Sequence, residues 1–131
     1  MESEFDRKVA SIIARDSRFD RGAYGFVSAA VEFTVSELPE RRHVSAAELL
    51  DGIRKFAVRS YGAVAANVLA SWGLRREDDV GTVVYLMIEV GLLRGSEEDS
   101  PEDFRTGRAL MPGTPVIRSV RRKSDKLPII D

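Results

Sequence analysis

The sequence contains no cysteine and only one histidine, His43, and this excludes several classes of site. Disulfides and thiolate zinc sites need cysteine, and the usual zinc enzymes need several histidines. We therefore expect no metal and no other cofactor. The lack of cysteine also fits a reducing compartment, so a cytoplasmic location is expected.

Long apolar runs are missing as well. The longest apolar-biased stretch, 80–93, contains Glu89 and is shorter than the roughly 20 residues that a membrane-spanning helix requires. The first eight residues are mostly charged or polar, which is unlike a signal peptide. With 131 residues, 44% of them hydrophobic, the chain suits one domain with a core and is too short for two. We expect a soluble single domain that does not bind membranes.

Apolar residues recur at intervals of three and four over most of the chain, which predicts helices. The apolar face of the second predicted helix is wide, so we expect this helix to be central. A helical turn should follow at 100–104, and the segment after residue 93 leaves room for a small hairpin near the C-terminal side. The predicted helices are 3–15, 21–38, 46–61, 63–72 and 79–92.

Several residues are interpreted as structural because they match signals for helix ends and core anchors. Ser45 and Glu48 form the sequence pattern of a capping box, and Gly73 should stop the helix that precedes it. Trp72 is expected to be the largest filler of the core, and Phe104 to anchor the helical turn. In the helix 46–61, Ser60 is expected to be buried and Arg54 to face solvent, and in the helix 63–72 Val64 is expected to point inward.

His43 is the obvious candidate for an acid or base, because imidazole titrates near neutral pH. Together with Glu48, Asp51 or Asp79, it could form the catalytic site of an enzyme that uses carboxylates. These side chains should then converge in a pocket. The alternative is a histidine that only helps to fix the start of a helix. No nucleophile motif or phosphate-binding glycine loop accompanies His43, so we expect no catalytic residue and no enzymatic activity.

Charge is distributed unevenly along the chain. Residues 108–131 carry six cations and two anions, whereas the other 107 residues carry 14 cations and 19 anions. The tail could fold back on the acidic part, or bind RNA, another protein or an anionic surface. The predicted partner-binding residues are the tail cations Arg118, Arg121, Arg122 and Lys123 and the acidic residues Glu97, Glu98 and Asp99.

The order of helices and turns across 46–92, followed by a loop-rich segment, is similar to a winged-helix layout. The solvent-facing positions expected on the last helix are Asp79, Thr82, Tyr85 and Glu89, and the loop after it is acidic. Such a surface would repel phosphates, so we do not expect this helix to read duplex DNA. The tail is the only segment with nucleic-acid character.

Five segments between residues 22 and 107 form a combination that is specific as a set: 23–27 (AYGFV), 43–53 (HVSAAELLDGI), 68–73 (VLASWG), 79–81 (DVG) and 98–104 (EDSPEDF). With these segments, residues 22–107 resemble an uncharacterised bacterial family restricted to the Planctomycetes–Verrucomicrobia group and neighbouring lineages. The family has no established activity, so the resemblance implies no functional residues, and the tail lies outside it.

Together these observations predict a mainly α, compact single-domain bundle of about five helices over 1–110, with an extended basic tail over 111–131. The function that we expect is a non-enzymatic protein-interaction or adaptor module, which uses its acidic body and basic tail to engage a partner or a second copy of itself. The alternatives are a nucleic-acid-associated protein that binds RNA or DNA through the tail and, less favoured, an enzyme using His43 and carboxylates.

Overall fold

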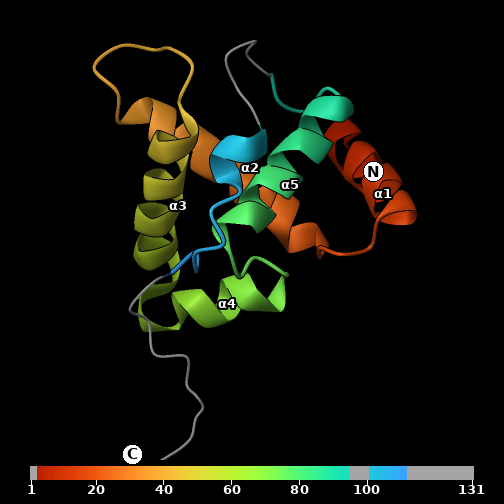
Figure 1. Ribbon diagram of the computed structural model, residues 1–131. Helices are drawn as coiled ribbons and strands as arrows, with labels where there is room; N and C mark the ends of the chain where they lie inside the picture. The colour runs from red at the N-terminus through yellow and green to blue at the C-terminus, as the bar shows by residue number, and fades with distance from the viewer. Residues whose placement is uncertain (1–2, 95–100, 112–131) are drawn as a thin grey trace, which may run out of the picture.

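The computed structural model describes residues 3–94 and 101–111, and this part of the chain is mainly helical (Figure 1). None of its helices is long and apolar enough to cross a bilayer. The helices and 3-10 turns are α1 (Glu4–Arg15), α2 (Arg21–Ser36), α3 (Ala46–Tyr61), η1 (Gly62–Val64), α4 (Ala65–Ser71), α5 (Glu77–Glu89) and η2 (Pro101–Phe104).

Helix α2 is central, as its wide apolar face predicts. It contacts α1, α3 and α5, while η2 packs against α5 and α3. Figure 1 shows α3 on one side of α2 and α5, α1 on the other, and α4 below them. The core takes residues from every helix, and the buried set on α2 is Ala23, Tyr24, Phe26, Val27, Ala30 and Thr34.

The helix-end signals in the sequence act as predicted. The Ser45 hydroxyl accepts a hydrogen bond from the amide of Glu48, whose carboxylate accepts one from the amide of Ser45, so the capping box is complete. Gly73 ends α4 with φ +98°, a conformation that glycine adopts without strain. Helix α2, however, ends at Ser36 and not at residue 38. Pro39 disfavours helical backbone at the residue before it.

Predictions of burial and exposure from the sequence were wrong in several places. Val64 was expected to point inward but is 52% exposed, because η1 interrupts the helix predicted for 63–72 and rotates this residue outward. Ser60, expected to be buried, is exposed in the last turn of α3. Arg54, expected to face solvent, is half-buried because it pairs with a carboxylate on α5. No hairpin forms in the described residues, which contain only an isolated antiparallel bridge between Arg76 and Ala109.

Glycine allows three close contacts between elements. A Cβ on Gly22 would lie 2.3 Å from Trp72 Nε1, and one on Gly52 would lie 1.8 Å from Thr34 Oγ1. A Cβ on Gly81 would lie 2.5 Å from the Cβ of Phe104. Phe104 is buried against α5, as predicted for an anchor.

Trp72 does not fill the centre of the core. Its side chain is half-buried at the edge, where its ring lies 5.7 Å from Phe26 and 6.0 Å from Tyr61. The largest fully buried side chain is Tyr24. Trp72 stands instead at one end of a row of aromatic rings that connects α2, α3 and α4.

Candidate functional site

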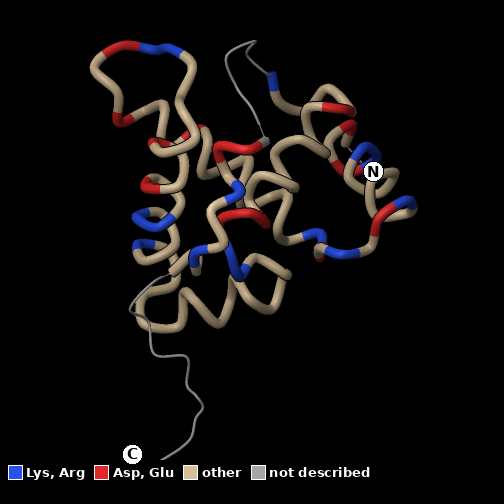
Figure 2. The backbone as a smooth tube through the Cα atoms, viewed as in Figure 1, with Lys and Arg blue, Asp and Glu red and all other residues tan. Residues whose placement is uncertain are grey.

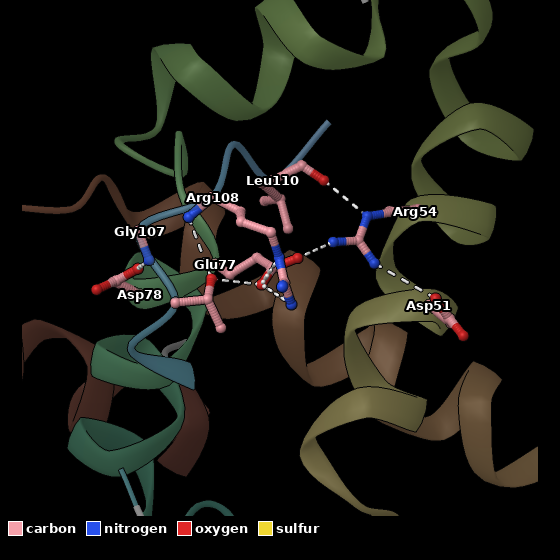
Figure 3. A network of polar contacts seen from close by, with 8 residues as sticks. Asp51, Arg54, Glu77, Asp78, Gly107, Arg108 and Leu110 are labelled. Carbon is pink, nitrogen blue, oxygen red and sulfur yellow. Dashed lines mark hydrogen bonds and ion pairs between the residues drawn. The ribbon is translucent and has the colours of Figure 1, made fainter. Parts of the chain in front are cut away.

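The densest polar network surrounds Glu77, the first residue of α5, which is only 3% exposed (Figure 3). Its carboxylate accepts a hydrogen bond of 2.6 Å from the Thr106 hydroxyl. It also pairs with Arg54 on α3 and, at 3.1 Å, with Arg108 on the segment 105–111. One buried carboxylate thus joins three parts of the chain that are distant in sequence.

This network fastens the segment 105–111 to the helical body. The Arg54 Nε donates to the carbonyl of Leu110 at 2.8 Å, and the Leu110 amide donates to the carbonyl of Arg75 at 2.9 Å. The Gly107 amide donates to the carboxylate of Asp78 at 2.8 Å. We call Arg54, Glu77, Asp78 and the segment 105–111 the C-terminal clasp.

The electrostatics of the clasp keep Glu77 charged. Burial of the carboxyl raises its pKa, but hydrogen bonds from Thr106 and Arg108 and the charges of both arginines outweigh this and leave the pKa below its usual range. A carboxylate that is ionised and fully paired at neutral pH is not a general acid. The clasp is therefore a structural centre.

His43 and its predicted catalytic partners do not converge. His43 is exposed, and it borders a groove that none of the three carboxylates lines. The carboxylate of Glu48 accepts hydrogen bonds from Arg42 and from the amide of Ser45, which hold its pKa at about 2. Asp51 pairs with Arg54, and Asp79 accepts the amides of residues 75 and 76 at the start of α5. The pocket that an enzyme of this kind requires is missing from the described residues.

The groove beside His43 is the other candidate site. It lies between α2, the N-terminal turn of α3 and the C-terminal half of α5, with a volume of about 560 Å³. Its floor is apolar and its rim carries arginines. The floor includes Val31, Val35, Leu49, Ile88 and Leu92, and the rim includes Arg41, Arg42 and Arg94.

The rim of the groove keeps positive charge available. Arg41 lies 3.7 Å from Glu32, and both side chains are more than 70% exposed, so water screens this contact. Arg42 is held by Glu48 at 2.8 Å. Arg94 is exposed and makes no ion pair with the residues that the structure describes. Among the described residues that line the groove, Glu32 is the only acidic one.

None of the predicted partner-binding residues is among those that the structure describes. The acidic residues Glu97, Glu98 and Asp99 and the tail cations Arg118, Arg121, Arg122 and Lys123 all lie outside the described residues. Within the described ranges, acidic and basic residues are equal in number, and four of the five net negative charges of residues 1–107 belong to residues outside these ranges, Glu2, Glu97, Glu98 and Asp99. The predicted structural residues Ser45, Glu48, Gly73 and Phe104 do lie at helix ends or in the core.

Sequence reasoning missed both the clasp and the groove. Glu77 is the first of three consecutive acidic residues, and only the folded chain shows that it is buried while Asp78 and Asp79 cap backbone amides. Among the described residues no group of three or more His, Asp or Glu side chains could hold a metal ion. Comparison with protein-family models, curated proteins and solved structures found no match, so the family resemblance of residues 22–107 stays a prediction.

Proposed function

We propose that this chain is a non-enzymatic interaction module whose groove binds a segment of a partner protein rich in apolar and acidic side chains. The observation that carries the proposal is the groove itself, an apolar floor bounded by Arg41, Arg42 and Arg94. Its volume of about 560 Å³ is within the range of pockets that hold ligands or peptide side chains.

The partner's chemistry follows from the charge of the groove. Arginines outnumber acidic residues among the described residues of its lining, so an acidic segment is electrostatically complementary and a basic one is repelled. The floor takes apolar side chains from α2, α3 and the C-terminal part of α5, and a groove between helices can bind an amphipathic helix by its apolar face. We therefore favour an amphipathic acidic helix over a second copy of the chain.

The roles of the charged side chains in the body favour a binding function over a catalytic one. Asp16, Glu48 and Glu77 all have lowered pKa values, and the cause in each case includes an arginine that holds the carboxylate. At neutral pH such groups stay ionised and cannot donate a proton. The hydrogen bonds of these carboxylates cap helix ends or hold segments of the chain together. The absence of cysteine supports a cytoplasmic location for the module.

The test is selection of peptides by phage display against the full chain, followed by fluorescence polarisation with the selected peptides. Selected sequences should combine apolar residues at helical spacing with Asp or Glu. Arg94→Glu should weaken binding about tenfold, because it reverses one close charge at the rim. Lys55→Glu, an exposed reversal on α3 away from the groove, is the matched control and should change the affinity less than about twofold.

Two results would refute the proposal that the groove binds a segment of a partner protein. Peptides that bind the Arg94→Glu variant as tightly as the wild type would not occupy the groove. A dimer by light scattering that the Arg94→Glu substitution dissociates, together with no selected peptide, would show that the groove binds a second copy.

The detailed order of the helices and the presence of an extended tail are also proposals. We propose a five-helix bundle in which α3, α4 and α5 follow the winged-helix order, with an extended basic tail from residue 111. The succession of elements supports it, and the segment 105–111 lies after α5, where a wing would be. The outer side of α5 borders a hollow lined by Asp78 and Glu89 as well as Arg105, which does not favour phosphate.

A second candidate function is binding of RNA or DNA through the tail. One observation favours it: the clasp holds Leu110 by hydrogen bonds to Arg54 and to the backbone of Arg75, and Arg75 is exposed, so the described chain ends beside an exposed arginine. If the tail alone makes the contact, a chain truncated after Met111 should lose all salt-dependent binding to nucleic acid.

A further inference from the structure

Two stretches of the chain carry no charged residue, and the structure places them side by side. The stretches are 22–31, within α2, and 60–74, which includes the end of α3, η1 and α4. Trp72 joins them, because its ring lies 5.7 Å from the ring of Phe26 and packs against Gly22. In Figure 2 the tube of α4 carries neither blue nor red. This part of the molecule therefore lacks charge, although charged residues make up 31% of the sequence.

Aromatic side chains reach the surface in this uncharged part. Tyr61 is 37% exposed, and Phe33 and Trp72 are half-buried. The ring of Phe26 lies 6.3 Å from Tyr61 and 5.7 Å from Trp72, so the rings form one continuous row. The centre of a protein–protein interface differs from the rest of a protein surface by its depletion of charge and its enrichment in Tyr, Trp and Phe.

The exposed side of α2 borders these rings, and we call it the α2 face. It consists of Arg21, Gly25, Ala29 and Glu32, which are all exposed. Their spacing of four, four and three residues places them on one side of the helix. Ala29 also lies within one helical turn of Phe33, so the face continues into the row of rings.

The glycine in the middle of the α2 face is not explained by contacts within the chain. A Cβ on Gly25 would meet no atom within 4 Å, whereas a Cβ on Gly22, Gly52 or Gly81 would collide with a neighbouring side chain. The other glycines that the structure describes have positive φ. Glycine inside a helix is less stable than alanine, because it loses more conformational freedom on folding. Its advantage is that a second helix can approach closely from outside.

The two ends of the α2 face carry opposite charges. Arg21 and Glu32 are eleven residues apart, which is close to three helical turns, so both project from the same side of α2. Arg21 makes no ion pair within residues 3–94 and 101–111. Glu32 lies 3.7 Å from Arg41, and both of these side chains are more than 70% exposed, so water screens the contact. Both ends can therefore form new ion pairs.

Two other charged side chains border the face, and both have contacts within the chain. The exposed Asp20 accepts the amide of Gly22 at 2.9 Å as the cap of α2. The guanidinium of Arg59 lies 5.5 Å from the centroid of the Phe33 ring. The charges that remain for a contact with another molecule are those at the two ends.

A second copy of the chain, related by a two-fold axis, is complementary to this face. When two α2 helices pack antiparallel with Gly25 and Ala29 in the middle, Arg21 of each copy comes opposite Glu32 of the other copy. A two-fold axis brings the same surface of both copies together, so a face of one charge would repel itself. A separate partner of one charge would meet a like charge at one end of the face.

We propose that two copies of the chain dimerise through the α2 face and that the neighbouring aromatic rings enlarge the contact. Exposed apolar surface rimmed by polar residues is typical of such interaction sites. The inference does not depend on the groove. Of the four residues of the α2 face only Glu32 also lines the groove, so Arg21 and Gly25 can be changed without altering its lining.

Sedimentation velocity of the full chain over a range of concentrations tests the proposal. The mass should rise from that of one chain to that of two. Arg21→Glu and Glu32→Arg should each raise the dissociation constant about tenfold, because each turns two attractive contacts into repulsive ones. A mixture of these two variants should dimerise as tightly as the wild type, because every charge then faces its opposite. Lys55→Glu, an exposed reversal on α3, is the control and should change the constant less than about twofold.

Gly25→Leu separates dimerisation from folding. Its urea midpoint should equal or exceed that of the wild type, since leucine is the better helix former and a Cβ there meets no atom, but the dimer should be lost. The α2 face is refuted if the chain is monomeric at every concentration, if Gly25→Leu dimerises like the wild type, or if the mixed variants do not dimerise. A dimer that Arg94→Glu dissociates, and that Arg21→Glu leaves intact, would use the groove and would also refute the α2 face.

Discussion

Replacing Glu77 by glutamine should weaken the attachment of the segment 105–111 to the body. Gln has the same shape and can still accept the Thr106 hydroxyl, so the change removes the charge and little else. Arg54, whose side chain is 26% exposed, then loses its main counter-charge, and Arg108 loses the one ion pair that it makes with a described residue. The backbone hydrogen bonds of the C-terminal clasp would remain, but the ion pairs that reinforce them would be lost.

The expected cost is about 2 kcal/mol in the free energy of unfolding. Hydrogen bonds to charged groups contribute roughly 1.5–3 kcal/mol, and breaking a fully buried pair costs roughly 3–5 kcal/mol. The lower range applies because the Arg108 side chain is 71% exposed and water can replace its contact. Since urea m-values are about 1–3 kcal/mol/M, the midpoint should fall by about 1 M.

Urea denaturation followed by circular dichroism measures this effect, and amide exchange locates it. Exchange at the Leu110 and Gly107 amides should speed up, while the amides of α2 stay protected. Asp51→Asn, which removes an exposed partner of the same Arg54, should cost less than about 0.5 kcal/mol. If the Glu77→Gln variant unfolds at the wild-type midpoint, the clasp does not stabilise the fold and the reasoning is wrong.

Three further predictions concern close contacts and acid stability. Gly52→Ala should destabilise the fold by about 1–3 kcal/mol despite its better helix propensity, because the new methyl meets Thr34, and Thr34→Ala should restore much of the loss in a double-mutant cycle of urea midpoints. Gly22→Ala should displace the ring of Trp72 toward solvent, which a red shift of tryptophan emission would report, and unchanged emission would contradict the contact. The pKa of Glu48 is about 2 when folded, so its contribution to stability is present above its unfolded pKa near 4.5 and is lost as pH falls through 2; the gap in urea midpoint between wild type and Glu48→Gln should close over that window.

Local signals allowed much of the fold to be predicted from sequence. The capping box at Ser45, the stop at Gly73 and the periodic apolar residues act within one or two helical turns, so they hold whatever the rest of the chain does. The anchor at Phe104 was predictable because a large apolar residue follows a helix-start signal. The burial of Ser60 and Val64 was predicted wrongly because both lie where α3 gives way to η1.

Tertiary pairing could not be predicted in the same way. Arg54 stands at a position of α3 that periodicity gives to solvent, and it is half-buried only because Glu77 and Leu110 meet it there. The groove likewise combines residues that are distant in sequence. Counting charges along the sequence reveals a basic tail. It does not show which arginines of the body are exposed on the same surface.

The central claim is that the groove between α2, α3 and α5 binds an acidic amphipathic segment. Methyl NMR of the full chain, titrated with a peptide selected by phage display, tests it most directly. The methyl signals of Val35, Ile88 and Leu92 should shift in proportion to saturation, while the core methyls of Ile53 and Leu69 stay in place. Shifts confined to residues outside the groove, or none at saturating peptide, would contradict the account.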